Sequence, residues 1–295
     1  MFVVGRGRTV RALDAADGRE RWQVRAGGVV SVAPVLAGDV LVLAGSDGIL
    51  RGVESATGEE RWQFQAGDAV KGVPCYDEAL GLVFFGALDK HLYALEADSG
   101  GERWRFSTSG NVEASPVLVD GTLLCGSLDG GLYALVAGTG RLLWRCDAGG
   151  PVATAAGAID GVICFANLRD EVVGCSLESG EVLWRYESPT SLATGVRIAA
   201  GVVCVATEDG DLVGLESAGG TVLWEVEGRE GVTSVASAGD RLWVGGADDS
   251  LYCIDGKTGS VVWQAHLNGT VDQSISVGAQ RLYVATSERL WCFLR

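Results

Sequence analysis

The segment Leu88-Asp89-Lys90-His91-Leu92-Tyr93-Ala94-Leu95-Glu96-Ala97-Asp98-Ser99-Gly100-Gly101-Glu102-Arg103-Trp104 holds the pattern on which the whole chain is built. It predicts a strand, a polar turn with glycine, and a second strand that carries one tryptophan. The pattern occurs seven times and closes each time on a tryptophan: Trp22, Trp62, Trp104, Trp144, Trp184, Trp224 and Trp263. The nearly constant interval of about 40 residues is typical of a repeat architecture.

Each full repeat predicts four antiparallel strands, which we call A to D in chain order. The C–D turn carries glycine in every repeat, as in Thr57-Gly58 and Thr139-Gly140. Glycine suits this place because a tight hairpin needs a residue with positive φ. We expect the first repeat to lack strand A and the last to lack strand D. Four-stranded sheets in series are the blades of a β-propeller.

The predicted fold class is therefore all-β, an eight-bladed β-propeller of four-stranded antiparallel blades that forms a single domain over residues 1–295. Seven blades are the alternative, because the periodic tryptophans number seven. That alternative leaves one B–C hairpin, either Phe2–Asp14 or Arg281–Leu294, without a sheet of its own.

The periodic tryptophans are interpreted as structural. Each lies on a D strand, where an indole packed flat on the next blade would bury on the order of 200 Å². At about 25 cal/mol/Å², that burial contributes up to roughly 5 kcal/mol for each repeat. The seven tryptophans are therefore predicted to hold neighbouring blades together rather than to stack on a ligand.

Composition excludes some function classes. The net charge is −15 with a pI near 4.5, and no cluster of Lys and Arg is present, so nucleic-acid binding is not expected. No apolar run reaches the roughly 18 residues of a membrane span. The N-terminal sequence has no leader-like pattern, which favours a cytoplasmic location, with the periplasm as the alternative if a leader has been removed.

Eight cysteines are scattered along the chain without a CxxC pair. Cys125, Cys164 and Cys204 fall at equivalent strand positions beside apolar residues, so we interpret them as small buried hydrophobic residues. Reduced thiols fit a cytoplasmic protein better than a disulfide framework does.

Several segments resemble the PQQ-like repeat of the quinoprotein alcohol dehydrogenase-like propellers. They include Gly126-Ser127-Leu128-Asp129-Gly130-Gly131-Leu132-Tyr133-Ala134-Leu135 and Leu251-Tyr252-Cys253-Ile254-Asp255, each followed by a Thr-Gly turn and a tryptophan. The resemblance covers the whole chain, and the tryptophans resemble what that family calls tryptophan-docking motifs.

The resemblance implies a propeller fold, and the family includes both quinoprotein enzymes and members that are not enzymes. The quinoproteins hold pyrroloquinoline quinone and calcium, and they carry a disulfide between adjacent cysteines. This sequence has no Cys-Cys dipeptide and no insertion that would build such a cofactor pocket. We therefore expect a non-quinoprotein member with no cofactor, and PQQ is not expected.

The candidate site lies where the D–A loops and the B–C tips of a propeller meet, because loops on a rigid scaffold commonly carry function. The first residues of the predicted A strands are small or hydroxyl-bearing in four repeats and charged at Lys71, Glu113 and Asp272. Lys71 and Glu113 belong to adjacent blades and are predicted to pair across the rim.

The B–C tips supply the remaining candidates for ligand or partner contact: Arg6, Lys90, His91, Asn167, Arg169 and Glu208. Neither histidine stands at a recognisable metal-ligand spacing, so no metal site is predicted. A solvated rim of ordinary ion pairs is the alternative interpretation of the whole set.

The sequence favours a non-catalytic binding or scaffolding propeller that presents one loop face to a protein, a peptide or a small polar ligand. One alternative is a PQQ-independent tailoring-type enzyme with its site at the channel mouth. The other is an envelope-assembly factor, which the resemblance suggests because the family includes the propeller lipoprotein of the Bam complex.

Overall fold

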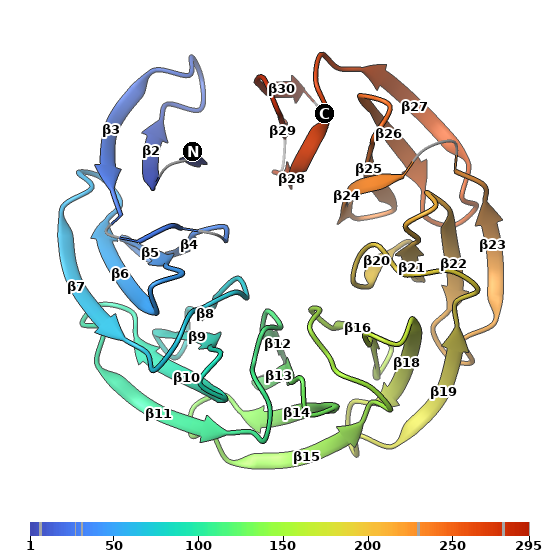
Figure 1. The fold of residues 1–295 in the computed structure, drawn as a ribbon, viewed down its shortest axis with the longest axis horizontal. Helices are drawn as coiled ribbons and strands as arrows, with labels where there is room; N and C mark the ends of the chain where they lie inside the picture. The colour runs from blue at the N-terminus through green and yellow to red at the C-terminus, as the bar shows by residue number, and fades with distance from the viewer. Residues whose placement is uncertain (6–7, 27, 31, 229–230, 279–280, 295) are drawn as a thin grey trace. The chain divides into compact units, whose positions relative to one another are not determined.

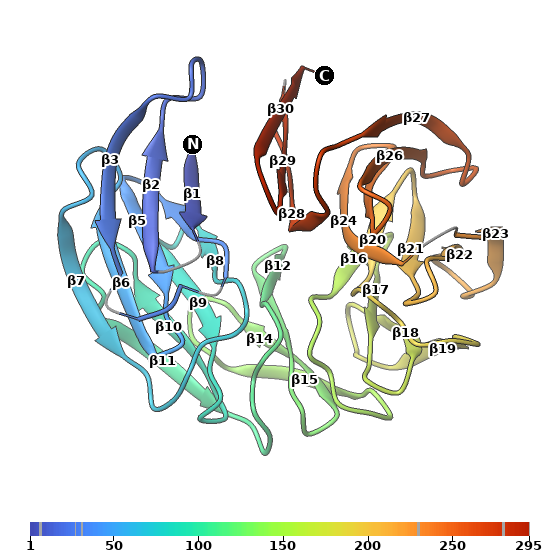
Figure 2. The ribbon, with the colours of Figure 1, turned by 45° about the horizontal axis from the view of Figure 1, so that its top comes forward.

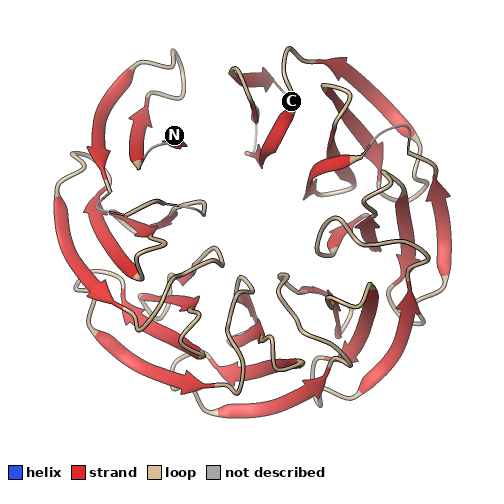
Figure 3. Ribbon diagram, in the orientation of Figure 1, coloured by secondary structure: helices blue, strands red, loops and turns tan. Residues whose placement is uncertain are grey.

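A computed structural model describes residues 1–5, 8–26, 28–30, 32–228, 231–278 and 281–294 of the 295-residue chain. Over these residues the structure consists of thirty strands joined by loops, with no helix (Figure 3). Since the described residues form no helix, they include none that is long and apolar enough to cross a bilayer. The chain divides into two compact units, Met1–Ala155 and Ala156–Arg295, which we describe in turn.

The first unit holds four antiparallel sheets, each built from consecutive strands (Figure 1). Figure 2 shows β1 beside β2 in the first of them. The sheets are β1(Phe2–Gly5), β2(Thr9–Leu13), β3(Glu20–Arg25); β4(Val35–Ala37), β5(Val40–Ala44), β6(Ile49–Glu54), β7(Glu60–Gln65); β8(Cys75–Asp77), β9(Leu82–Gly86), β10(His91–Glu96), β11(Glu102–Ser107); and β12(Val117–Val119), β13(Thr122–Gly126), β14(Gly131–Val136), β15(Leu142–Asp147).

The second unit repeats this plan with four further sheets. They are β16(Gly157–Ile159), β17(Val162–Ala166), β18(Glu171–Ser176), β19(Val182–Glu187); β20(Arg197–Ala199), β21(Val202–Ala206), β22(Leu212–Glu216), β23(Val222–Val226); β24(Val232–Ala238), β25(Arg241–Gly246), β26(Ser250–Asp255), β27(Val261–His266); and β28(Val271–Val277), β29(Arg281–Thr286), β30(Leu290–Leu294).

The prediction of an eight-bladed β-propeller is confirmed. Over the described residues there are eight separate sheets, and the first and last have three strands while the others have four. The first sheet lacks strand A and the last lacks strand D, as expected. The seven-bladed alternative is wrong, because the hairpin Arg281–Leu294 pairs with β28 in a sheet of its own. The single domain over residues 1–295 stays a prediction.

Five inner strands, β4, β8, β12, β16 and β20, begin four residues later than the sequence indicated, and the first three of them follow a proline. We expected strand A of the third blade over Lys71–Cys75, whereas β8 spans Cys75–Asp77. The inner strands of the second, third and fourth blades each start directly after a proline, at Pro34, Pro74 and Pro116. Proline has no N–H to donate to the ladder, so pairing starts beyond it.

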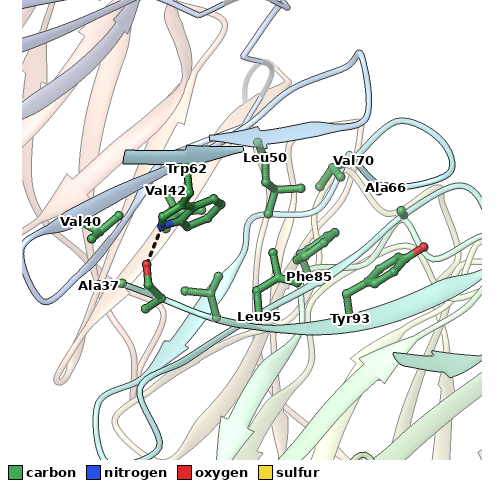
Figure 4. Packing of buried hydrophobic residues seen from close by; sticks show 14 residues of the cluster. Ala37, Val40, Val42, Leu50, Trp62, Ala66, Val70, Phe85, Tyr93 and Leu95 are labelled. Atoms are coloured by element: carbon green, nitrogen blue, oxygen red, sulfur yellow. Dashed lines mark hydrogen bonds between the residues drawn. The ribbon is translucent and has the colours of Figure 1, made fainter. Parts of the chain in front are cut away.

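The indole N–H of five periodic tryptophans donates a hydrogen bond to a backbone carbonyl of the following blade. In the first unit, Trp62 donates to Ala97 over 2.8 Å (Figure 4). The other pairs are Trp22 with Ser55, Trp104 with Ala137, Trp184 with Ser217, and Trp224 with Gly256, at 2.8–3.1 Å. The indole face of Trp62 lies on Gly100, where an added Cβ would meet it at 2.6 Å. Each of these contacts links two consecutive sheets within one unit.

Apolar side chains fill the space between consecutive sheets. In one cluster of the first unit, Leu50 and Val70 pack with Phe85, which stacks on Tyr93 (Figure 4). The three cysteines at equivalent strand positions, Cys125, Cys164 and Cys204, are buried in these layers, which confirms their interpretation as core residues. Within each unit, packing therefore holds each sheet against its neighbours.

Candidate functional site

The predicted pairing between Lys71 and Glu113 is confirmed. The Lys71 Nζ lies 2.9 Å from the Glu113 Oε1, although the two residues belong to adjacent blades of the first unit. They meet because the backbones just before β8 and β12 run close together. The Val73 N–H donates to the Ser115 Oγ over 2.8 Å, and a Cβ on Gly72 would lie 2.6 Å from the Ala114 carbonyl oxygen.

The environment of this ion pair is open. The Lys71 side chain is 53% exposed and that of Glu113 is 23% exposed. A catalytic lysine or glutamate at the channel mouth would need a desolvated setting that shifts its pKa. The geometry is instead that of a surface ion pair, in which each charge largely cancels the other.

The B–C tips of the first unit are held by an aspartate. Asp89 accepts the Tyr93 hydroxyl at 2.5 Å and the Gly67 N–H at 2.7 Å. Burial and the Asp89 carboxylate raise the pKa of Tyr93 to about 12. The next residue, Lys90, is exposed and has φ +70°, where the equivalent tip uses Gly130. The His91 Nδ1 lies 2.8 Å from the Asp89 carbonyl oxygen, so His91 is part of the tip itself.

The equivalent tip of the fourth blade is built around Asp129. Burial acts to raise the pKa of Asp129, but hydrogen bonds from Tyr133, the Ser109 N–H and the Gly131 N–H outweigh it and lower the pKa below its ordinary value. The Arg145 guanidinium lies over the Tyr133 ring at 5.6 Å. The tip aspartates therefore serve to shape the loop.

The predicted candidates of the second unit separate into two kinds. Asn167 is buried, and its amide donates to the Glu171 Oε2 over 2.6 Å while its carbonyl oxygen accepts the Arg169 N–H. Asn167 thus shapes its own tip. Arg169 and Glu208 are exposed to solvent. Arg6 lies outside the described residues, and so does the side chain of Asp272, whose backbone is in β28.

The predicted candidates are not all brought together. Lys71 and Glu113 meet, whereas the contacts of His91 are with its own tip through Asp89 and Tyr93. Ala193 and Thr233, which were expected to begin A strands, line an open polar pocket of about 540 Å³ in the second unit. Arg197 also lines this pocket, although it is not among the residues predicted from the sequence.

Sequence reasoning missed a second feature, on the outer strands. Seven outer strands carry a β-bulge directly before the tryptophan, so one residue there has no cross-strand partner. In the first three blades this residue is Arg21, Arg61 or Arg103, and each forms an ion pair with an acidic side chain of its own blade.

From the fourth blade onward the bulge residue is apolar. In the second unit it is Leu183 on β19, Leu223 on β23 and Val262 on β27, and these side chains are 48–52% exposed. Val222 and Val261, next to two of them, are exposed to the same degree. Trp263 follows Val262 and is 40% exposed, whereas Trp62 in the first unit is 7% exposed. The second unit therefore presents apolar side chains on three consecutive outer strands.

The residues do not fit the quinone cofactor of the family's enzymes. All eight cysteines are free thiols, so the disulfide of adjacent cysteines has no counterpart here. Among the described residues, no group of three or more His, Cys, Asp and Glu side chains is arranged to hold a metal ion.

Comparison with known proteins agrees with the repeat pattern. The family described as outer membrane protein assembly factor BamB matches residues 1–75, 70–163, 137–235 and 209–294. The crystal structure of BamB from Moraxella catarrhalis superposes with a TM-score of 0.83 at 22% identity, covering 99% of this chain and 90% of that one. The computationally designed Ika8 protein superposes with a TM-score of 0.58 at 15% identity, covering 91% and 98%. No curated protein matches the sequence.

Proposed function

We propose a scaffolding role for this chain, which belongs to the family described as the outer membrane protein assembly factor BamB. In this proposal the chain is not an enzyme, and it binds a protein partner. The open Lys71–Glu113 pair supports a non-catalytic role, because neither side chain lies in the desolvated pocket that catalysis at this place would need. The envelope-assembly role and the cytoplasmic location stay predictions.

The observation that carries the proposal is the row of exposed apolar bulges on β19, β23 and β27. Leu183, Leu223 and Val262 are each about half exposed, although the same position in three other blades is an ion-paired arginine. Apolar groups gathered on one surface of a soluble protein commonly mark an interaction site. A protein partner that covered them would remove this apolar surface from water, and this burial would favour binding.

The bulges also indicate how the partner would bind. The outer strands are edge strands, whose free backbone groups invite pairing with a further strand. A bulge interrupts that row of groups and opposes strand addition. We therefore place the partner against the side chains of the bulge residues. A bilayer surface is a poorer fit, because a net charge of −15 opposes approach to anionic headgroups.

The loop face predicted from the sequence is the competing docking surface for the same function. Two of its charged residues, Lys71 and Glu113, lie 2.9 Å apart, so this pair offers little unpaired charge to a partner. The two surfaces make different predictions, so one experiment separates them.

The test is site-specific photo-cross-linking in cells. A cross-linker at position 222, directly before the bulge residue Leu223, is expected to capture a defined protein, whereas one at position 60, the equivalent place in the first unit, is not. The triple variant Leu183→Arg/Leu223→Arg/Val262→Arg, which installs the residue found in the first three blades, should abolish capture. The variant Lys71→Ala/Glu113→Ala should keep it.

Three results would count against the proposal. Equal capture from positions 60 and 222 would remove the role of the apolar bulges, and loss only in the Lys71→Ala/Glu113→Ala variant would move the site to the loop face. Capture of a second copy of this chain alone, with a dimer in light scattering, would make the surface a self-association site.

A further inference from the structure

A half-buried arginine in the second unit, Arg197, has no opposing charge beside it among the described side chains. Arg197 begins β20, the inner strand of the sixth blade, and it lines the open polar pocket of about 540 Å³ together with Thr233, Ser234 and Ser237 from β24. At the equivalent position the preceding repeats have Val35, Cys75, Val117 and Gly157. A charged residue at this place is therefore particular to the sixth blade.

The guanidinium is fixed by two backbone carbonyls. Its Nε–H donates to Val235 of the next inner strand over 3.0 Å, and its Nη1 donates to Val196 over 2.9 Å. These bonds use two of its five N–H groups. Both acceptors are neutral, and no carboxylate among the described side chains pairs with the guanidinium. Burial without an opposing charge lowers the pKa of Arg197.

The walls of the pocket add hydroxyl groups and little bulk. Ser234 is buried, with 8% of its surface exposed, and Ser237 lies three residues further along the same strand, on its opposite face. The Thr233 hydroxyl is already used, because it donates to the Gly245 carbonyl over 3.0 Å. The small residues Ala193 and Gly195 leave the space in front of the guanidinium open.

We propose that this pocket binds a carboxylate, held by the remaining N–H groups of Arg197 and by the Ser234 hydroxyl of β24. A planar guanidinium matches a carboxylate in shape and forms two parallel hydrogen bonds with it. One positive charge balances one negative charge, whereas a phosphate dianion would leave an unbalanced charge in a protein that already carries −15. The source is either a small carboxylic acid or an acidic side chain of a peptide. This site is separate from the apolar bulges and does not depend on the proposed function.

The experiment is a titration of the ¹⁵N-labelled protein with sodium acetate, which replaces sodium chloride at constant ionic strength. We expect the side-chain Nε–H signal of Arg197 to shift and saturate, because the Nε–H is held in place by Val235. The Nε–H of Arg241, which is paired with Asp255, serves as the internal reference and should not move.

The second measurement follows the backbone amide signal of Ser234 during acetate titration of variants at Arg197 and Arg241. Arg197→Gln should weaken acetate binding at least tenfold, and Arg197→Lys, which keeps the charge but loses the planar fork, should weaken it less. Arg241→Gln removes the same charge elsewhere in the unit and should leave affinity unchanged. If Arg197→Gln does not fold, the shift of the Arg197 Nε–H in the unmodified protein still decides the question.

Two further probes complete the test. The first is a capped five-residue peptide with one aspartate, and the second is its asparagine counterpart. If the aspartate peptide binds more tightly than acetate and the asparagine peptide does not bind, the carboxylate belongs to a peptide. If acetate binds as tightly as the aspartate peptide, the carboxylate belongs to a small acid. A non-saturating acetate response, an equal response to chloride, or tighter binding of inorganic phosphate would overturn the proposal.

Discussion

The outer strands of the first three blades and those of the second unit share one backbone and differ in what they show to water. On β3, β7 and β11 the bulge residue is an arginine tied to an acid of its own blade, as Arg61 is to Asp39 and Glu54. On β19, β23 and β27 it is a half-exposed leucine or valine. The bulge exists in both units, so it does not depend on the side chain that occupies it. The fold therefore determines where the bulge lies, and the side chain at the bulge can differ between blades according to function.

The tryptophan that follows each bulge should show the largest difference between the units. Trp62→Ala removes a buried indole and its hydrogen bond to Ala97, and we expect it to lower the free energy of unfolding by about 3–5 kcal/mol. Trp263→Ala removes an indole that is already 40% exposed and should cost about 1–2 kcal/mol. Urea unfolding followed by circular dichroism measures both. Equal losses would mean that the two indoles are equally important for stability.

The glycines beneath the indoles should behave alike in both units. Gly100 under Trp62 and Gly220 under Trp184 have φ +69°, and an added Cβ would meet the indole at 2.6 and 2.4 Å. We expect Gly100→Ala and Gly220→Ala each to cost about 2–3 kcal/mol in urea unfolding, from backbone strain and overpacking. Gly121→Ala is the control, because Gly121 has φ +77° with open space around it, and it should cost about 1 kcal/mol. Equal losses at Gly100 and Gly121 would remove the indole contact from this account.

Exchanging the bulge residues tests whether the difference between the units is functional or structural. Leu223→Arg should change the free energy of unfolding by no more than about 0.5 kcal/mol, since the side chain is exposed. It should abolish partner capture if the apolar row is the docking surface. A large loss of stability would show instead that Leu223 is part of the packing.

The reverse exchange, Arg61→Leu, carries a pH signature. The hydrogen bond from Arg61 holds the pKa of Asp39 below its ordinary value of 3.8. A carboxylate with a lowered folded-state pKa contributes stability above that ordinary value and loses it as the pH falls. The small stability gap between the unmodified protein and Arg61→Leu should therefore be present at pH 7 and close below about pH 4. Thermal unfolding at a series of pH values measures it, and a gap that does not change with pH would contradict this role.

Thiol labelling compares how readily the two units open, and we expect it to show the smallest difference between them. Burial raises the pKa of Cys204 in the second unit to about 12 and also raises that of Cys125 in the first. We expect neither thiol to react at pH 7.5 in the folded protein, whereas the exposed Cys292 reacts at once. Labelling under mild urea, read by mass spectrometry, should modify Cys125 and Cys204 at similar rates. Rapid labelling of either thiol without urea would show that its layer is open.

The sequence was sufficient to predict the sheets but not the candidate binding surfaces. The spacing of Trp22 to Trp263 and the turn glycines predicted the repeat, because these residues recur in each blade, and the strand pattern at the two ends of the chain predicted eight blades with three-stranded ends. The pairing of Lys71 with Glu113 was also foreseen, since two charges interrupt a row of small residues. Arg197 was missed because a single charge in an apolar strand is conspicuous only when the repeats are aligned position by position. The bulge residues were missed because pairing in the sheet, not periodicity, shows which residue is left without a partner.

The indole contacts have a direction, and it bears on how the protein is made. Each of the five hydrogen bonds runs from a tryptophan to a carbonyl that lies 32 to 35 residues later in the chain. During synthesis on the ribosome, a newly emerged sheet therefore keeps its indole bare until most of the next one has followed. If each sheet docks as soon as it emerges, the growing end displays one uncovered tryptophan at a time.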